Sequence, residues 1–193
     1  MGMGIALVFL VLIGMVALGV VIYAIGIYNQ LIQIKVNVDK SWANIDVLLK
    51  QRYDEIPKLV KVCEGYMKFE QATLEKVTLA RTRYLEAKSP GQVAQADSML
   101  TGALKSLFAV SESYPDLKAN NNFMQLQQRV SYLENQIADR REFYNDSVGV
   151  YNARIKQIPE VFVANAMGFT DREMYKVAES EKVSPDIKFD MPK

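Results

Sequence analysis

Residues 5–27 read IALVFLVLIGMVALGVVIYAIGI and contain no charged side chain. Their one polar side-chain group is the hydroxyl of Tyr23. At about 1.5 Å per residue, a helix of this length measures roughly 34 Å, which is enough to cross a hydrocarbon core of about 30 Å. The stretch therefore predicts a transmembrane helix that contacts membrane lipid, with Tyr23 and Tyr28 as candidate residues of the membrane interface.

A cleaved secretory signal peptide is the alternative interpretation of this stretch. Such peptides have a basic segment before an apolar run of about 7–15 residues, followed by small residues at the cleavage site. Here no Lys or Arg precedes the run, the run is longer, and residues 25–28 (Ile-Gly-Ile-Tyr) do not resemble a cleavage site. We therefore expect a retained anchor.

The basic residues predict how the anchor is oriented. None precedes it, whereas Lys35, Lys40 and Lys50 follow it. Because basic residues favour the cytoplasmic side, we expect a single-pass protein of the cell (inner) membrane with its N-terminus outside. The expected organisation is an anchor at 1–28, a cytoplasmic helical-bundle domain at 29–180 and a mobile tail at 181–193.

Composition excludes several classes of function. The chain has 23 basic and 22 acidic residues, a balance that gives no electrostatic reason to expect binding to nucleic acid. It contains no histidine, which excludes a histidine-based catalytic triad and the usual zinc sites. The single cysteine, Cys63, is expected to be a buried, inert thiol. We expect no catalytic residue, no cofactor and no metal, and hence a protein that is not an enzyme.

The segment after the anchor predicts a long helix that packs against others. It has neither Gly nor Pro from Ile27 to Ile56, so the spanning helix is expected to continue into it. Its apolar residues recur every 3.5 positions on average, as in coiled coils, with Arg52 in one apolar place. We expect a kink near Pro57 and an end at Gly65.

Three further helical stretches follow. The first of these stretches is interrupted at residues 89–92 (Ser-Pro-Gly-Gln), which carry the signature of a new helix start. It therefore consists of two segments, one on each side of this interruption, and we expect these two middle segments to lie end to end. A long helix is predicted from Asn122 to Ile158, and a short one from a capping box at residues 170–173. The predicted fold is all-α: one N-terminal transmembrane helix that continues into an elongated antiparallel helical bundle.

Arginines interrupt the apolar faces of the predicted helices. Together with nearby carboxylates they predict a polar layer, with two interpretations: an anion-binding or partner-contact site, or a layer that fixes helix register while the guanidinium groups reach the surface. We favour the second interpretation. The residues concerned are Arg52, Arg140, Arg141, Asp54, Glu55 and Asp139.

A second candidate set consists of aromatic residues and asparagines on the long helices. Two Tyr-Asn pairs lie seven positions apart, which places them on one helix face. Buried asparagines at such positions commonly specify register, so a structural role is favoured over ligand binding. The candidate contacts are Trp42, Tyr144, Asn145, Tyr151 and Asn152.

Several sequence motifs lie in order along the chain from Tyr28 to about Tyr175. They are YNQL (28–31), WANIDVLLK (42–50), RYDEIPKLV (52–60), AVSESYPDLKA (109–119), ENQI (134–137), Arg141, the pairs Tyr144-Asn145 and Tyr151-Asn152, and Gly168-Phe169. In these motifs and in their order the chain resembles the LemA family of bacterial membrane-anchored proteins.

The resemblance implies a LemA-like four-helix bundle behind one N-terminal span, in a family with no established enzymatic activity. Members resemble scaffold or accessory proteins, and some are associated with membrane proteases. One departure is informative: where the family often has Gly-Tyr-Ala-x-His-Glu, residues 65–70 read GYMKFE. Any role of that histidine in relatives is therefore absent from this chain.

Three functional hypotheses follow. The leading one is a non-enzymatic, membrane-anchored structural, scaffold or adaptor protein that forms a homo-oligomer, since apolar stripes run along its helices. The second is an accessory subunit of a membrane protease or envelope-stress system, which requires another membrane protein as partner. The third is an anion or small-molecule sensor built around Arg52 and Arg141.

Overall fold

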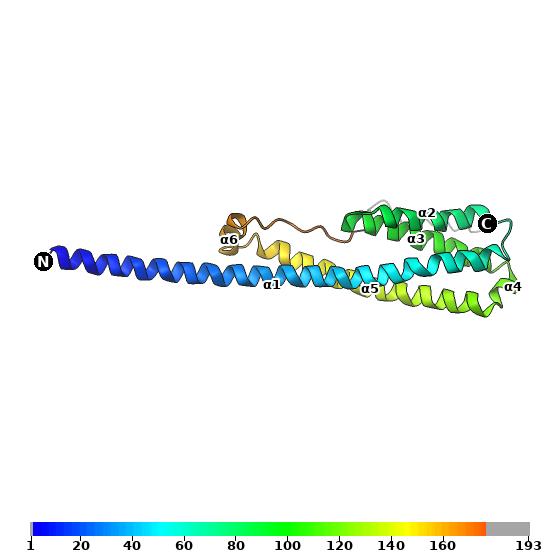
Figure 1. Ribbon diagram of the computed structural model, residues 1–193, viewed down its shortest axis with the longest axis horizontal. Coiled ribbons are helices and arrows are strands. Elements are labelled where there is room, and N and C mark those ends of the chain that lie inside the picture. The colour runs from blue at the N-terminus through cyan, green and yellow to red at the C-terminus, as the bar shows by residue number, and fades with distance from the viewer. Residues whose placement is uncertain (1, 177–193) are drawn as a thin grey trace, which may run out of the picture. The chain divides into compact units, whose positions relative to one another are not determined.

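A computed structural model describes residues 2–176 of the chain, and over these residues it consists of helices without strands (Figure 1). The all-α prediction is confirmed. The helices are α1 (Gly2–Glu64), α2 (Gln71–Glu86), α3 (Pro90–Ser111), α4 (Pro115–Lys118), α5 (Asn121–Arg154) and α6 (Glu160–Ala166). The predicted tail at 181–193 lies outside the described residues.

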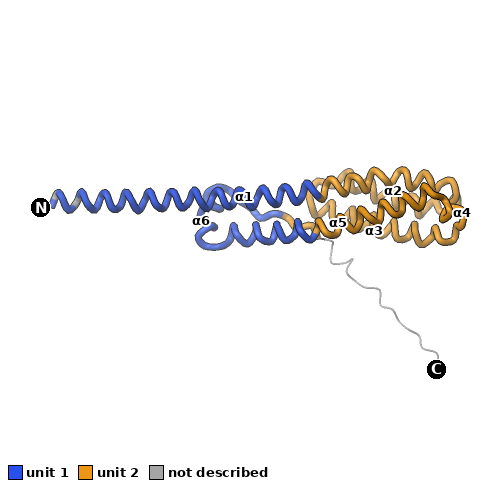
Figure 2. The backbone as a smooth tube through the Cα atoms, turned by 90° about the horizontal axis from the view of Figure 1, so that it is seen from below, with its two compact units in different colours: residues 1–44, 142–172 blue, residues 45–141, 173–193 orange. Residues whose placement is uncertain are grey.

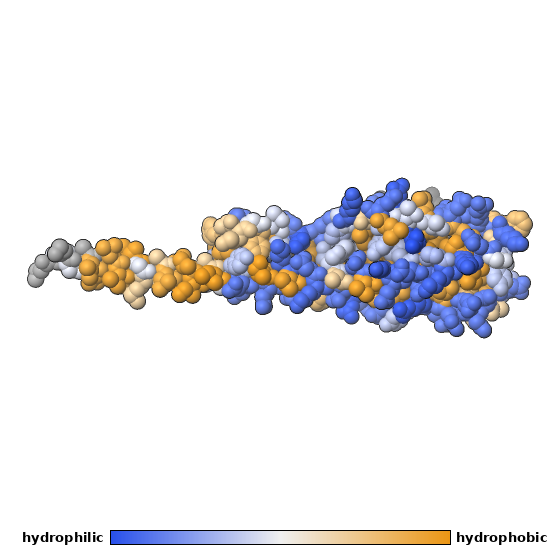
Figure 3. Space-filling model, viewed as in Figure 1, coloured by the Kyte–Doolittle hydropathy of each residue, from blue (hydrophilic) through white to orange (hydrophobic). Residues whose placement is uncertain are grey.

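Helix α1 is a single helix of 63 residues that includes the predicted anchor. It continues through Pro57, where the expected kink stays a prediction, and it ends immediately before Gly65, as the sequence predicts. The large apolar side chains described between Ile5 and Ile25 are each more than half exposed, and because they occupy consecutive positions they surround the helix. Figure 3 shows one face of this apolar surface. This segment is long and apolar enough to cross a membrane, and an apolar surface all round a helix is typical of a membrane span.

The chain divides into two compact units (Figure 2). Unit 1 comprises residues 1–44 and 142–172, and unit 2 comprises residues 45–141 and 173–193. Helices α1 and α5 each contribute residues to both units.

The core of unit 2 is formed by the apolar stripes of its helices. The apolar side chains that repeat along residues 45–64 of α1 are buried, and so are the matching faces of α2, α3 and α5. Each fully buried large residue contributes about 1.5–3 kcal/mol of burial free energy. The core includes Ile45, Leu49, Ile56, Leu59, Cys63, Val77, Leu100, Leu104, Leu107, Val130, Leu133 and Ile137. Burial raises the pKa of the Cys63 thiol to about 11, which agrees with the prediction of an inert thiol.

Helices α2 and α3 lie side by side rather than end to end, so that part of the prediction was wrong (Figure 1). Only residues 87–89 connect them, and short connections favour antiparallel neighbours. The turn has the predicted chemistry: the Ser89 hydroxyl accepts a hydrogen bond from the Gln92 amide nitrogen at 3.3 Å. The Gln92 side chain accepts one from the Lys88 amide nitrogen at 2.8 Å.

The segment between α3 and α5 contains the short helix α4 and is held by side chains from around it. Leu117 is fully buried, and the Tyr114 hydroxyl donates to Glu70 at 3.3 Å. The Asn120 side chain donates to the Tyr66 hydroxyl at 3.0 Å and accepts from the Phe123 amide nitrogen at 3.1 Å. Within residues 109–119, Tyr114 and Leu117 therefore have a structural role.

The short helix of unit 1 is not where the sequence predicted it. Helix α5 ends at Arg154, Pro159 precedes α6, and residues 170–173 are not helical. The predicted capping box fails because side chains of α5 bind the backbone of Thr170 and Arg172, whose polar groups a helix would need for its own hydrogen bonds. Pro159 was interpreted as a helix end, although proline is also favoured where helices begin.

The cap at Ser89 gives a direct test of the α2–α3 turn. Replacing Ser89 by Ala is expected to lower the free energy of unfolding by about 1 kcal/mol, because the Gln92 amide loses its acceptor. Denaturant unfolding of the full-length protein in detergent measures this change. Ser106→Ala is the matched control, since Ser106 is an exposed α3 residue that bonds only to its own helix at Gly102. Equal effects of the two substitutions would contradict the assigned cap.

Candidate functional site

The centre of unit 2 holds a buried ion pair between α1 and α3. Arg52 is completely buried, and its Nη2 donates to the carboxylate of Asp97, which is buried as well. The Nη1 atom of Arg52 lies 3.4 Å from the Thr101 hydroxyl. A guanidinium with no exposed surface does not extend to solvent, so the expectation that Arg52 reaches the surface was wrong.

Arg141 of α5 approaches the same carboxylate. Its Nη2 lies 3.8 Å from Asp97 Oδ2, and its guanidinium lies 5.3 Å from the ring centroid of Tyr175. Tyr175 belongs to unit 2, in the segment that begins at residue 173, and is 2% exposed. The neighbouring Arg140 is exposed, so the structure separates two arginines that the sequence grouped together. We call the set of Arg52, Tyr53, Tyr84, Asp97, Arg141 and Tyr175 the polar layer.

Two tyrosines bring α1 and α2 into the polar layer. The rings of Tyr53 and Tyr84 stack with centroids 3.7 Å apart and planes at 8°. The Tyr84 hydroxyl lies 3.4 Å from Asp46 Oδ1. Burial, followed by the negative charge of Asp46, raises the pKa of Tyr84 to about 12. Burial, followed by the charge of Asp97, also raises the pKa of Tyr53 and of Tyr175, so these phenols stay neutral.

The polar layer is costly to bury. It contains two guanidinium groups and one carboxylate, and among residues 2–176 the Nε atoms of Arg52 and Arg141 have no hydrogen-bond partner. Each unsatisfied buried polar group costs about 1–3 kcal/mol. Buried ion pairs rarely stabilise a fold relative to apolar residues, and their best-attested role is to fix register. The layer therefore specifies which faces of α1, α3 and α5 meet.

Sequence reasoning found the arginines of this layer but missed its carboxylate. Asp54 and Asp139, expected as partners, are exposed, and Glu55 pairs with Lys58 at 2.9 Å. The signal for Asp97 was available: it is the one acidic residue in α3, and it lies four positions after Val93 and three before Leu100 on the buried face.

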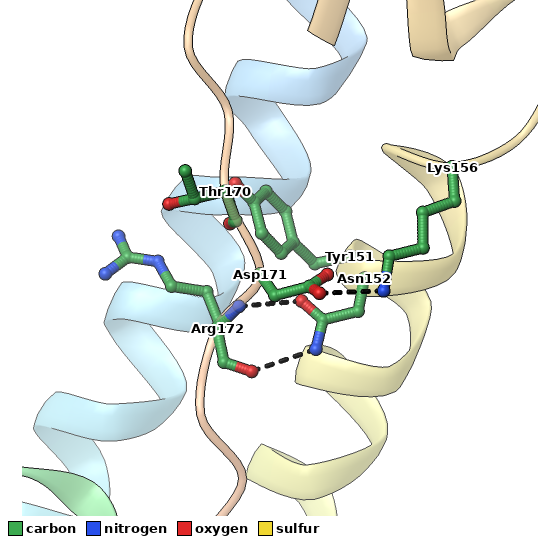
Figure 4. A network of polar contacts seen from close by, with 6 residues as sticks. All are labelled: Tyr151, Asn152, Lys156, Thr170, Asp171 and Arg172. Carbon is green, nitrogen blue, oxygen red and sulfur yellow. Dashed lines mark hydrogen bonds and ion pairs between the residues drawn. The ribbon is translucent and has the colours of Figure 1, made fainter. Parts of the chain in front are cut away.

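In unit 1, the Tyr-Asn pair at 151–152 holds an extended segment against α5 (Figure 4). The Asn152 side chain donates to the Arg172 carbonyl at 2.9 Å and accepts from the Arg172 amide nitrogen at 2.8 Å. The Tyr151 hydroxyl donates to the Thr170 carbonyl at 3.1 Å. Lys156 and Asp171 form an exposed ion pair at 2.7 Å. The Asn152 side chain therefore binds the backbone of Arg172.

The other predicted contact residues of unit 1 lie where α1 meets its neighbours. Trp42 and Tyr144 pack with ring centroids 5.2 Å apart, which joins α1 to α5. Tyr28 packs edge-on against Phe169 at 6.0 Å. Asn145 is half-buried beside Tyr144, and Tyr23 is 61% exposed on the apolar part of α1.

The described part of the chain contains no candidate metal site. Among residues 2–176, no group of three or more His, Cys, Asp or Glu side chains is arranged to hold an ion. The polar layer contains one carboxylate, and it is already bound by arginine.

Comparison with known proteins identifies the family. Residues 41–189 match the LemA family. The chain belongs to the LemA family. The match covers the C-terminal part of α1 and the described residues that follow it, and it confirms the resemblance drawn from the sequence motifs.

Individual proteins match over most of the chain. Protein LemA of Metamycoplasma hominis is 25% identical over 183 residues, which cover 92% of this chain and 82% of that protein. Magnetosome protein MamQ 2 of Paramagnetospirillum magneticum is 23% identical over 77% of this chain. MamQ of Magnetospirillum gryphiswaldense is 21% identical over the same share. The chain spans 64% of the length of these MamQ proteins.

Substitution of Arg52 tests the polar layer. Arg52→Met is expected to lower the free energy of unfolding by about 3–5 kcal/mol, because Asp97 stays buried without its main partner. The double variant Arg52→Met/Asp97→Leu is expected to recover part of this loss, since neither member of the pair is then buried without the other, while Arg141 loses its carboxylate. Arg83→Met is the control, because its ion pair with Glu86 is exposed and worth at most about 1 kcal/mol. If the changes in the free energy of unfolding caused by Arg52→Met and by Asp97→Leu simply add up in the double variant, a direct pair is contradicted.

Substitution of Asn152 tests the docked segment. Asn152→Ala removes both hydrogen bonds to Arg172, so the backbone there is expected to open and trypsin to cleave faster after Arg172. Asn152→Asp keeps the acceptor and is expected to give an intermediate rate. Asn44→Ala, at an exposed position of α1, is the control. An unchanged cleavage rate in Asn152→Ala would show that the segment is held by other contacts.

Proposed function

We propose that this protein is a membrane-anchored, non-enzymatic scaffold or adaptor of the LemA type. The observation that carries the proposal is that the two ends of α1 have different surroundings. Its first part exposes apolar side chains in every direction, as lipid-facing helices do, and its last part forms one wall of the core of unit 2. Membership of the LemA family supports a membrane-associated, non-enzymatic role.

A groove on unit 2 offers a contact surface for a partner protein. It has a volume of about 640 Å³ and lies between α1 and α2. Its floor is apolar, through Met67, Leu74 and the half-exposed Leu79, and Glu64 and Lys68 stand at its edge. Apolar surface with a polar rim is typical of protein–protein contacts, which favours an adaptor and also suits an accessory subunit of a membrane complex.

Self-association is part of the proposal, although not through the stripes that suggested it. The apolar stripes of α1, α3 and α5 are buried within the chain itself, so they are not available to a second copy. Among the apolar surfaces that stay exposed, the groove between α1 and α2 is the one proposed for self-association. The two grooved edges of a pair of copies would then meet face to face, as in most homodimers.

The sensor hypothesis is less favoured by the geometry. Arg52 and Arg141 are both directed at Asp97, and Arg52 has no exposed surface. An anion would have to displace a carboxylate from the centre of the core to reach Arg52.

The proposed placement in the membrane keeps the N-terminus outside and the bundle in the cytoplasm. It is supported by Lys35, Lys40 and Lys50, which follow the span.

Photo-crosslinking in native membranes tests the contact groove. A photoreactive amino acid at Leu79 is expected to give defined adducts with a second copy or with another membrane protein. The matched control is Leu85, which is 63% exposed on the same helix but does not line the groove. Absence of adducts at Leu79, or equal adducts at both positions, would contradict the groove as a contact surface.

Mass photometry of the full-length protein in detergent tests self-association independently. Particles of two or more copies are expected, and Leu79→Glu is expected to shift them toward single copies while Leu85→Glu does not. A strictly monomeric wild-type protein would exclude self-association and leave only the adaptor role.

A further inference from the structure

Helix α6 builds an apolar groove against the end of the predicted span. The groove has a volume of about 440 Å³, and the surface over α6 is apolar in Figure 3, as it is along the N-terminal part of α1. All of its lining residues belong to unit 1. They are Val21, Ala24, Ile25 and Tyr28 of α1, and Phe162, Val163, Ala166 and Met167 of α6 and the residue that follows it.

The side chains around α6 are those of a surface that avoids water. Phe162 is 68% exposed, Met167 61% and Ile158 79%. From Gln157 to Thr170 the sequence has one charged residue, Glu160. That residue is 8% exposed and forms an ion pair with Arg154 at 3.0 Å, so it does not place a free charge on the apolar surface.

The polarity of unit 1 changes sharply just beyond this groove. A neighbouring polar pocket of about 270 Å³ shares Tyr28 and Met167 with the groove and is lined also by Lys35 and Arg172. The ammonium group of Lys35 lies 5.9 Å from the ring centroid of Phe169. Val21 of the apolar groove and Lys35 of the polar pocket are about 21 Å apart along α1, at 1.5 Å per residue. This distance covers the boundary between the acyl chains and the headgroups of a lipid leaflet.

We propose that α6 is a second membrane-contacting element, which lies in the interfacial layer of the leaflet that α1 leaves, with lipid acyl chains in the groove between the two helices. This inference rests on the proposed membrane anchor. The groove is continuous with the apolar surface of α1 and shares Val21, Ala24 and Ile25 with the predicted span, so its occupant must itself lie in the membrane. Residues 21–28 cover roughly 10 Å along α1, the depth to which interfacial helices are buried.

The lipid occupant is also favoured by the flanking groups. Tyr28 stands at the boundary between groove and polar pocket, where aromatic residues meet headgroups. Lys156 and Asp171 are paired, and Lys35 and Arg172 lie on the polar side. Lipid in the groove would give unit 1 a second contact with the membrane at α6, in addition to the anchor on α1.

Spin-label accessibility measured on the full-length protein in lipid nanodiscs tests this inference. A nitroxide is attached to Phe162→Cys, and, in separate variants, to Val16→Cys on the anchor and Tyr132→Cys on the exposed face of α5. The buried Cys63, with its raised thiol pKa, is expected to stay unlabelled, and the wild-type protein checks this. Collision rates are measured with oxygen, which concentrates in lipid, and with a water-soluble nickel chelate.

The label at Phe162 is expected to collide severalfold more with oxygen and severalfold less with nickel than the label at Tyr132. Met167→Cys, on the same surface, is expected to behave like Phe162→Cys and guards against a local effect of one substitution. If Val16 is in lipid while Phe162 and Met167 are in water, the inference fails and the anchor stands. If Val16 is in water as well, the proposed function fails. Low accessibility of Phe162 to both reagents would show that protein, such as a second copy, covers α6, and would overturn the inference.

Discussion

Burial of the Arg52 guanidinium against Asp97 is the constraint on which the arrangement of unit 2 depends. A charge that is removed from water needs its partner in place, and here the partner comes from a different helix. The same carboxylate faces Arg141 of α5, while Tyr175 covers that arginine. Helix α2 joins through the stacked rings of Tyr84 and Tyr53. Helices α1, α2, α3 and α5 and the segment at 173–176 therefore meet at one polar layer.

The polar layer explains why an otherwise simple pattern of apolar stripes gives one packing. Stripes that repeat every 3.5 residues fit together in several registers, because leucine and isoleucine side chains are alike. A buried charge fits in only one of these registers, since every other one leaves it without a partner. Unit 1 uses a different device, in which the Asn152 side chain binds the backbone of Arg172 and fixes the path of the chain after α6.

Much of the fold was predictable because it follows from local chemistry. The apolar repeat of α1, the cap at Ser89 and the end before Gly65 are local features, and each was recognised from the sequence. What failed depends on contacts between distant residues. The capping box at 170–173 is locally sound, but Asn152 and Tyr151 bind the backbone that the helix would need. Asp97 was missed although its place on the apolar face of α3 could be read from the sequence, since its partner Arg52 is identified only when α3 packs against α1.

The function proposed for this LemA family member follows from the same division between local and distant features. The apolar segment of α1 predicts lipid contact from the sequence alone, whereas the groove beside α6 exists only because the chain returns to α1 after α5. In the same way, the groove between α1 and α2 is a product of folding. Both surfaces are left open by a chain that has buried its regular stripes internally, and both are suited to apolar partners: lipid in one case and protein in the other.

Hydrogen exchange of the full-length protein, compared between wild type and Asp97→Asn, tests the shared polar layer most directly. If the layer joins the elements of unit 2, the neutral side chain is expected to speed exchange together in α3, in residues 45–64 of α1, in residues 121–141 of α5 and at 173–176. Exchange in α6 and in residues 142–154 of unit 1 is expected to change less. Faster exchange confined to the turns of α3 around residue 97 would contradict a layer that holds these elements together.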